Sequence, residues 1–182
     1  MSSAPPGATA KRAAFTLLEL LAVIALVAIL ASLVLGVGRR ASTAGKTARA
    51  KAELAALAAA LEGFKRTYGD YPRTDDAAHL LQSLLGRRGL AGTAISGRVI
   101  LELAPFATAG ATDPFNRPAS ELIDPWGRPY VYVYKVPAGG WTNAGFILYS
   151  PGPDGKDAPA LLPGGFADPA PRENTDNVHA NR

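Results

Sequence analysis

A single carboxylate, Glu19, lies inside an apolar run that covers residues 15–38, and a basic pair, Lys11 and Arg12, precedes the run. The run is long enough to cross a bilayer as a helix. An ionisable group within a membrane segment is energetically costly, so it is by default a candidate for function. Glu19 is therefore the first candidate site residue of this sequence.

Few other residues offer catalytic chemistry. The sequence has no cysteine, its two histidines are His79 and His179, and it contains neither a nucleophile motif nor a phosphate-binding glycine loop. His79 lies among aliphatic residues without converging partners, which favours a packing role over metal ligation. The formal net charge of +4 is a mild excess that does not by itself indicate nucleic-acid binding. We expect no enzymatic activity.

Two further acids, Asp154 and Asp157, lie in a polar region rich in proline and glycine near the C-terminus. Their spacing lacks the alternating ligands and the terminal glutamate of an EF-hand loop. From the residues alone, this region is predicted to form a solvated turn.

Three interpretations of the apolar run can be compared. A secretory signal peptide has a shorter apolar core followed by a small-residue cleavage site, which this run does not show. An ordinary single-span anchor explains the hydrophobicity but leaves the cost of Glu19 unexplained. The third interpretation depends on the residues at the start of the run, which read AAFTLLELL.

This string resembles the class III signal of type IV pilins and type II secretion pseudopilins. The resemblance implies that a prepilin peptidase cuts between Ala14 and Phe15 and methylates the new amine of Phe15. Glu19 then occupies the fifth mature position, where it pairs with the Phe15 amine of a neighbouring subunit and sets the register of a filament. Such a pair partly neutralises two charges that are costly in an apolar bundle. The family usually has glycine before the cut, whereas this chain has the small residue Ala14.

Basic residues give a conflicting indication of topology. Five of them follow the apolar run, namely Arg39, Arg40, Lys46, Arg49 and Lys51. Counting flanking Lys and Arg places the downstream side in the cytoplasm. The resemblance implies the reverse, with the N-terminus inside and the C-terminal domain in the periplasm, and we follow the resemblance.

The helical pattern continues beyond the run, because no proline occurs before Pro72. An apolar stripe at steps of three and four residues predicts one buried helix face, formed by Leu54, Leu57, Leu61, Phe64 and Tyr68. Four charged residues are expected on the solvent face: Lys51, Glu53, Glu62 and Lys65. Gly69 and Pro72 end the helix. A short second helix is expected between an acidic cap at residues 74–76 and Gly86.

The segment 98–103 is predicted to be either a short strand or a helical turn, and a loop follows it. The next string contains a predicted structural turn at Asp124, Pro125, Trp126 and Gly127. It resembles the DPWG-x-x-Y turn of type II secretion pseudopilins. Alternating tyrosine and valine over 130–136 and the apolar run 145–150 predict an antiparallel hairpin lying across the helix stripe. Packing is favoured over base stacking for these tyrosines, because no Arg or Lys is interleaved with them.

The resemblance also implies a calcium site. In the family, a Ser-x-Gly-x-Asp-Gly turn and a later acidic string close over one calcium ion. The matching positions here are the carbonyl of Pro151, the carboxylate of Asp154, and Asp176 with Asn177. Hard oxygen ligands of this mixed type are the ones calcium selects. The chain has Asn177 where the family often has a second aspartate, and its intervening loop is longer.

The resulting prediction is an α+β, type IV pilin-like fold in which a long N-terminal helix packs by its second half on a small antiparallel sheet. The segments are a leader (1–14), a transmembrane and polymerisation helix (15–38), an amphipathic continuation (39–71) and a C-terminal domain (72–182). The expected role is that of a structural subunit of a periplasmic pseudopilus that helps drive protein export. The expected partners are further copies in a helical filament, minor pseudopilins, the prepilin peptidase, the inner-membrane assembly platform and the membrane, without nucleic acid.

Two other functions stay open at this point. One is a type IV pilin or minor pilin for adhesion, motility or DNA uptake, although such pilins commonly close the C-terminal region with a disulfide and this chain has no cysteine. The other is a membrane-tethered binding domain that never polymerises. Loss of Glu19 distinguishes the latter, since it should block filament assembly and leave a tethered domain intact.

Overall fold

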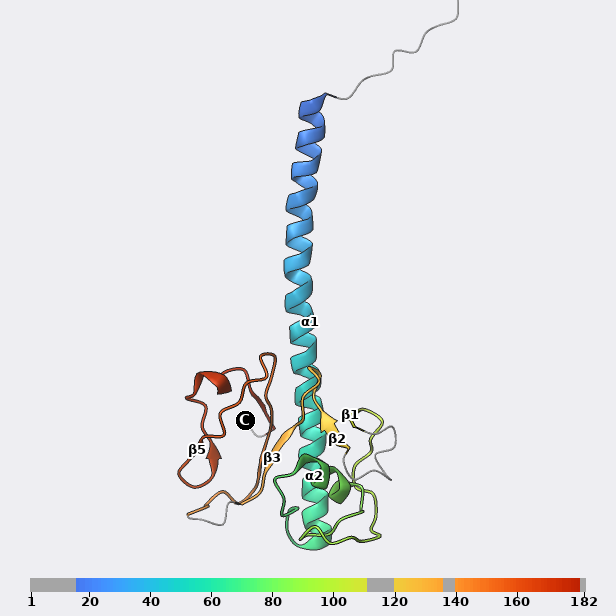
Figure 1. Ribbon diagram of the computed structural model, residues 1–182, viewed down its shortest axis with the longest axis vertical. Helices are drawn as coiled ribbons and strands as arrows, with labels where there is room; N and C mark the ends of the chain where they lie inside the picture. Colours follow the sequence, from blue (N-terminus) through green and yellow to red (C-terminus); the bar gives the residue numbers. More distant parts are fainter. Residues whose placement is uncertain (1–15, 111–119, 136–139, 181–182) are drawn as a thin grey trace, which may run out of the picture. The chain divides into compact units, whose positions relative to one another are not determined.

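The computed structural model describes residues 16–110, 120–135 and 140–180, with the side chains of 33–40 left aside (Figure 1). The chain divides into two compact units, Met1–Ser42 and Thr43–Arg182. The predicted cleavage residues Ala14 and Phe15 lie outside the described residues.

The helix α1 extends from Leu17 to Tyr68 without interruption. Within the first unit its large apolar side chains are each at least half exposed, from Leu17 to Leu30. Among the residues that the structure describes, no helix combines the length and the hydropathy needed to cross a membrane. The boundaries of the transmembrane segment, 15–38, stay a prediction.

The apolar stripe on the second half of α1 forms the centre of the core in the second unit. Leu54, Leu57, Leu61 and Phe64 are fully buried, as predicted, while Tyr68 is partly buried against the same core. The helix ends as expected, because Gly69 adopts a φ of 90° and donates its amide hydrogen to the Lys65 carbonyl at 2.7 Å.

The short helix α2, Ala77–Leu84, begins at the predicted acidic cap. The carboxylate of Asp76 accepts a hydrogen bond from the His79 amide at 2.7 Å and so satisfies one of the unpaired amides of the first turn. Its leucines, Leu80, Leu81 and Leu84, are buried in the core.

The described strands are short and form three small antiparallel sheets. The central sheet has the order β3-β4-β7, with Val131 opposite Tyr149 and Ser150 opposite Val178. The other two sheets are two-stranded pairs, β1 with β2 and β5 with β6. The bounds are β1 Ala107–Ala109, β2 Glu121–Ile123, β3 Val131–Val133, β4 Ile147–Ser150, β5 Leu161–Leu162, β6 Phe166–Ala167 and β7 Val178–His179, with a 3-10 helix, η1, at Arg172–Asn174.

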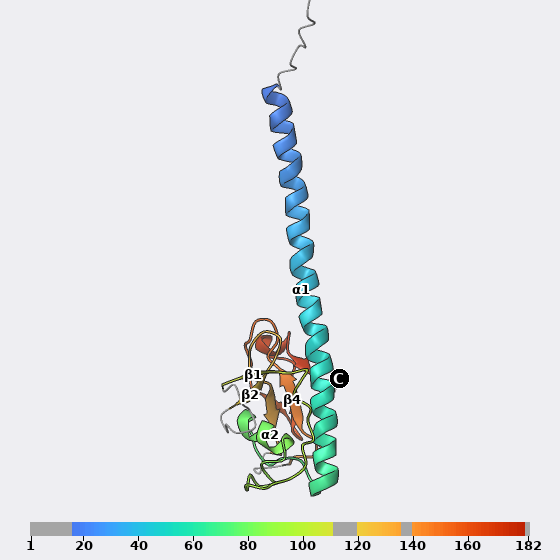
Figure 2. The ribbon, with the colours of Figure 1, turned by 90° about the vertical axis from the view of Figure 1, so that its right-hand side faces the viewer.

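The central sheet packs on the second half of α1 (Figure 2). Tyr130, Tyr132, Phe146 and Leu148 share one buried cluster with the stripe leucines. The α+β fold class and the antiparallel hairpin are therefore confirmed, and these tyrosines pack in the core as expected.

Three expectations fail. Segment 98–103 forms neither a strand nor a helix, and the loop predicted after it contains β1. Strands β5, β6 and β7 carry too few residues to show an alternating pattern, and the sequence did not indicate them. Glu53, expected on the solvent face, is only 5% exposed. It is buried because the core supplies hydrogen-bond donors to its carboxylate, as described below.

Candidate functional site

Glu19 takes part in a local cap at the start of α1. Its Oε2 accepts hydrogen bonds from the Thr16 amide at 3.2 Å and from the Thr16 hydroxyl at 3.1 Å, and its own amide donates to that hydroxyl at 3.2 Å. This reciprocal arrangement is a capping box, which satisfies two free amides of the first turn. The spacing Thr-x-x-Glu could have shown it in the sequence.

The cap leaves part of the carboxylate available. Both of its hydrogen bonds use Oε2, and among the described residues no partner bonds Oε1. Thr16 and the following leucines are exposed, so Glu19 lies on an apolar surface that no described residue of its unit covers. The arrangement can accept a cation from outside the chain.

The turn at Asp124 connects β2 to β3 and is held by one buried carboxylate. Asp124 is 2% exposed, and its Oδ1 accepts the amides of Trp126 at 2.9 Å and Arg128 at 3.0 Å. The Gly127 amide donates to the Asp124 carbonyl at 2.9 Å, with Gly127 at a φ of 87°. The other carboxylate oxygen, Oδ2, accepts the Ser150 hydroxyl at 2.5 Å. The turn is thereby tied to the end of β4.

The residues expected to hold calcium lie in the C-terminal loop, defined here as residues 151–177. The Asp154 amide donates to Asp176 Oδ2 at 3.0 Å, so the fold brings these two acids together. Gly152 packs so closely against the Asp176 carbonyl that a β-carbon there would overlap it. Pro151 is buried beside them.

Asn177 has one atom without a partner. Its Nδ2 donates to Asn174 Oδ1 at 3.2 Å, whereas its Oδ1 is buried and accepts no hydrogen bond from the described residues. A buried acceptor without a donor is energetically costly unless a ligand satisfies it. Within the described part of the chain, no three His, Cys, Asp or Glu side chains converge on a point. Any cation held here therefore relies on carbonyl and amide oxygens besides the carboxylates.

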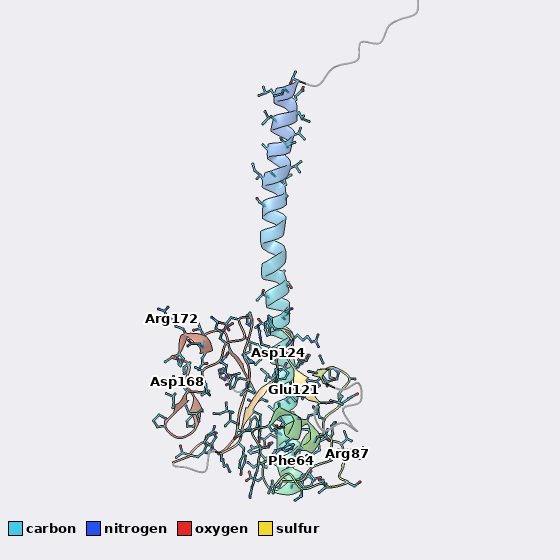
Figure 3. The ribbon with its side chains drawn as sticks, viewed as in Figure 1. Phe64, Arg87, Glu121, Asp124, Asp168 and Arg172 are labelled. Atoms are coloured by element: carbon cyan, nitrogen blue, oxygen red, sulfur yellow. The ribbon has the colours of Figure 1, made fainter. Side chains whose placement is uncertain are left out.

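Asn174 orders the same loop, a role that the sequence did not indicate. Its Nδ2 donates to the carbonyls of Ala158 at 3.0 Å and Asp168 at 2.7 Å, and its Oδ1 accepts the Ala158 amide at 2.9 Å. The side chain is buried at the end of η1. Figure 3 shows the neighbouring residues Asp168 and Arg172 on the outer side of this loop.

Glu53 forms the most buried charged contact of α1. Its Oε2 accepts the Tyr130 hydroxyl at 2.5 Å, and its Oε1 accepts Arg49 Nε at 2.6 Å. Burial, and then the hydrogen bond to Glu53, raises the pKa of Tyr130 far above its ordinary value. The contact connects α1 to Tyr130, which follows the Asp124 turn.

Comparison with known proteins finds one matching family model and one similar curated protein. Residues 9–35 match the model of the prokaryotic N-terminal methylation motif, a span that includes Ala14, Phe15 and Glu19. The chain is 30% identical over 152 residues to the type II secretion system core protein G of Pseudomonas aeruginosa, covering 81% of this chain and 87% of that relative. No solved structure matches the chain significantly.

The name of the relative identifies it as a core protein of a type II secretion system. The long N-terminal helix, the small antiparallel sheets and the methylation motif agree with that kinship. The chain therefore belongs to the type II secretion pseudopilin family, as a relative of core protein G.

Proposed function

We propose that the chain is the major structural subunit of a periplasmic pseudopilus. It is cut between Ala14 and Phe15 by a prepilin peptidase, methylated on Phe15, held in the inner membrane with its C-terminal domain in the periplasm, and assembled into a helical filament by an assembly platform. Growth of the filament, with minor pseudopilins, helps to move exported proteins across the outer membrane.

The observation that carries the proposal is the bare apolar surface of α1. Leu17 and Leu18 are each 78% exposed, and the large apolar residues as far as Leu30 are uncovered in the same way. Exposed apolar surface on this scale marks an interaction site. Lipid covers it before assembly and the α1 helices of other copies cover it afterwards.

Glu19 sets the axial offset between neighbouring subunits that pack through this surface. The Oε1 atom lies outside the local cap, and in an apolar bundle it pairs with the methylated amine of Phe15 on a neighbour displaced along the filament axis. Leaving either charge without its partner in such surroundings costs about 3–5 kcal/mol. That penalty favours one axial offset over the others.

Glu19→Gln and Glu19→Ala separate the two roles of the residue. Glutamine keeps the capping box, whereas alanine removes it. We expect both variants to fold and to insert, and both to form no filaments when produced with the rest of the secretion machinery. Because the chain has no cysteine, single engineered cysteines allow filament contacts to be measured by cross-linking.

Glu102→Ala, on an exposed segment of the second unit, is the matched control and should assemble normally. Normal filaments from Glu19→Gln would contradict the proposed pairing. A wild-type chain that stays monomeric in the complete system would instead support a tethered, non-polymerising domain.

A calcium ion bound to the C-terminal loop is the second part of the proposal. Asp154 and Asp176 supply carboxylate oxygens, Pro151 supplies its carbonyl, and Asn177 supplies the buried Oδ1 that has no donor. This mixed set of oxygens fits calcium. The bound ion supplies positive charge that offsets the paired carboxylates.

Titration calorimetry of the full chain in detergent micelles tests the ion. We expect calcium to release heat and to raise the melting temperature, and Asp154→Asn to reduce both effects. Asp168→Asn, an acid of the same loop outside the proposed ligand set, should change neither. No heat and no change in melting temperature with the wild-type chain would remove the site.

A further inference from the structure

Arg128 joins the Asp124 turn to the first residues of the C-terminal loop. Its Nη1 donates to the Gly152 carbonyl at 2.7 Å and to the Pro153 carbonyl at 3.3 Å. Gly155 lies directly against the guanidinium, and a β-carbon at that position would overlap it. One cationic side chain thus lies along the turn formed by residues 150–155.

The backbone of Arg128 is itself fixed. Its amide donates to the buried Asp124 carboxylate at 3.0 Å, and its carbonyl accepts the Asp124 amide at 2.7 Å. The same carboxylate accepts the Ser150 hydroxyl, whose oxygen in turn accepts the Gly152 amide at 3.1 Å. Two routes therefore lead from Asp124 to Gly152, one through Ser150 and one through the Arg128 side chain.

These contacts hold the turn in the shape that brings two acids together. Gly152 packs on the Asp176 carbonyl. Two residues later, the Asp154 amide donates to the Asp176 carboxylate. Hydrogen bonds from a guanidinium are charge-assisted and stronger than neutral ones. The carbonyls of Gly152 and Pro153 are thus oriented by a cation that belongs to the chain.

We propose that Arg128 is a positioning residue that closes the 150–155 turn before any ion binds and so presents Asp154 and Asp176 in one place. The consequence for calcium rests on the calcium site proposed above, whereas the closure of the turn does not. A site that is already closed binds its ion more tightly, because the apparent dissociation constant is the intrinsic one divided by the closed fraction.

Simple electrostatics predicts the opposite effect of removing Arg128. A fixed positive charge near a cation site repels the cation, so loss of the charge alone would strengthen calcium binding. Loss of closure would weaken it. The direction of the change in affinity therefore separates positioning from repulsion.

The experiment uses the full chain in detergent micelles, as wild type, Arg128→Ala and Arg128→Lys. Amide hydrogen exchange is followed in EDTA and in calcium, with the Asp154 amide as the reporter of closure because it bonds Asp176 directly. Calcium affinity is measured by calorimetry on the same samples. Arg172→Ala, on an exposed arginine of η1, is the matched control.

We expect Arg128→Ala to speed exchange of the Asp154 amide in EDTA by about tenfold or more, and to weaken calcium binding by a similar factor. Saturating calcium should restore the lost protection. Arg128→Lys keeps the positive charge but not the planar set of donors. Its Asp154 exchange rate and its calcium affinity should lie between those of the wild type and Arg128→Ala. Arg172→Ala should match the wild type, and exchange in β4 should be unchanged in every variant.

Unchanged exchange of the Asp154 amide in EDTA with both Arg128 variants would overturn the proposal. Tighter calcium binding by Arg128→Ala would also overturn it, in favour of repulsion. If the wild type binds no calcium, the calcium site fails, and exchange in EDTA still decides the role of Arg128. If Arg128→Ala does not fold, Arg128→Lys supplies the same comparison.

Discussion

Two glutamates on α1 show how surroundings determine what a carboxylate does. Glu19 is exposed on an apolar surface and caps its own helix through one oxygen. Glu53 is buried and both of its oxygens accept strong donors, from Tyr130 and Arg49. A buried carboxylate without donors is costly, so Glu53 is tolerated only through these contacts. Glu19 is instead left with an oxygen for a partner outside the chain.

Removing the Tyr130 hydroxyl should destabilise the second unit. Tyr130→Phe leaves Glu53 Oε2 buried without its donor, which costs about 1.5–3 kcal/mol for a hydrogen bond to a charged group. Denaturation of the full chain in urea, followed by circular dichroism, measures the loss.

Tyr132→Phe is the matched comparison. The Tyr132 hydroxyl donates to the neutral Pro72 carbonyl at 2.8 Å, and its loss should cost less, about 0.5–1.5 kcal/mol. Equal losses for the two variants would contradict the charged character of the Glu53 contact.

Buried tyrosines should make the fold sensitive to alkali. Burial, together with carboxylates bonded to Tyr130 and Tyr149, raises the pKa of both phenols above the ordinary value of about 10. Burial raises that of Tyr132 as well. Unfolded tyrosines release their protons above about pH 10, whereas the folded ones keep theirs. The stabilising contribution of these tyrosines to the free energy of unfolding is therefore fully present below pH 10. Above pH 10 it falls, by up to about 1.4 kcal/mol per pH unit for each tyrosine.

Urea midpoints between neutral pH and pH 11 test this expectation. Tyr149→Phe should make the alkaline decline shallower, because one of the raised phenols is gone. A midpoint that stays constant to pH 11 would show that these phenols ionise in the folded chain as readily as in the unfolded one.

At the scale of elements, the helices and strands that the sequence predicted correctly are those with a clear residue pattern. The stripe on α1 repeats over several turns, and α2 has both a cap and a stop, so each could be placed from the residues. Tyrosine and valine alternate over residues 130–136 around β3, and residues 145–150 around β4 form an apolar run, so both strands of the antiparallel pair could be recognised. The strands β1 and β7 lie in short stretches without a strand pattern in the sequence, so they depend on long-range pairing.

The C-terminal loop depends on side-chain hydrogen bonds, which a linear pattern does not reveal. Asn174→Ala should release the loop, because the Ala158 and Asp168 carbonyls and the Ala158 amide lose their partner together. We expect faster proteolysis between residues 158 and 172, with little change in the exchange of core amides.

Glu173→Ala provides the control for Asn174, since Glu173 is the exposed neighbour in the same 3-10 helix. Protease should cut the C-terminal loop of Glu173→Ala at the wild-type rate. Equal cutting rates for the two variants would show that Asn174 does not hold the loop.

At the scale of the whole molecule, family membership follows from an N-terminal motif and from similarity over most of the sequence. The methylation motif lies at residues 9–35, and the similarity to core protein G covers most of the sequence. The calcium set could be proposed from the sequence only by resemblance, because Pro151, Asp154 and Asp176 meet through the fold rather than through spacing. The roles of Asn174 and Arg128 needed three-dimensional contacts altogether.

The central claim is that the leading apolar helix is a polymerisation element made ready by processing. Intact-mass spectrometry of the chain isolated from cells that contain its prepilin peptidase tests this claim most directly. We expect a protein that begins at Phe15 and carries one added methyl group on its amine. A chain that retains Ala14 and the residues before it, with no methyl group, would contradict the account.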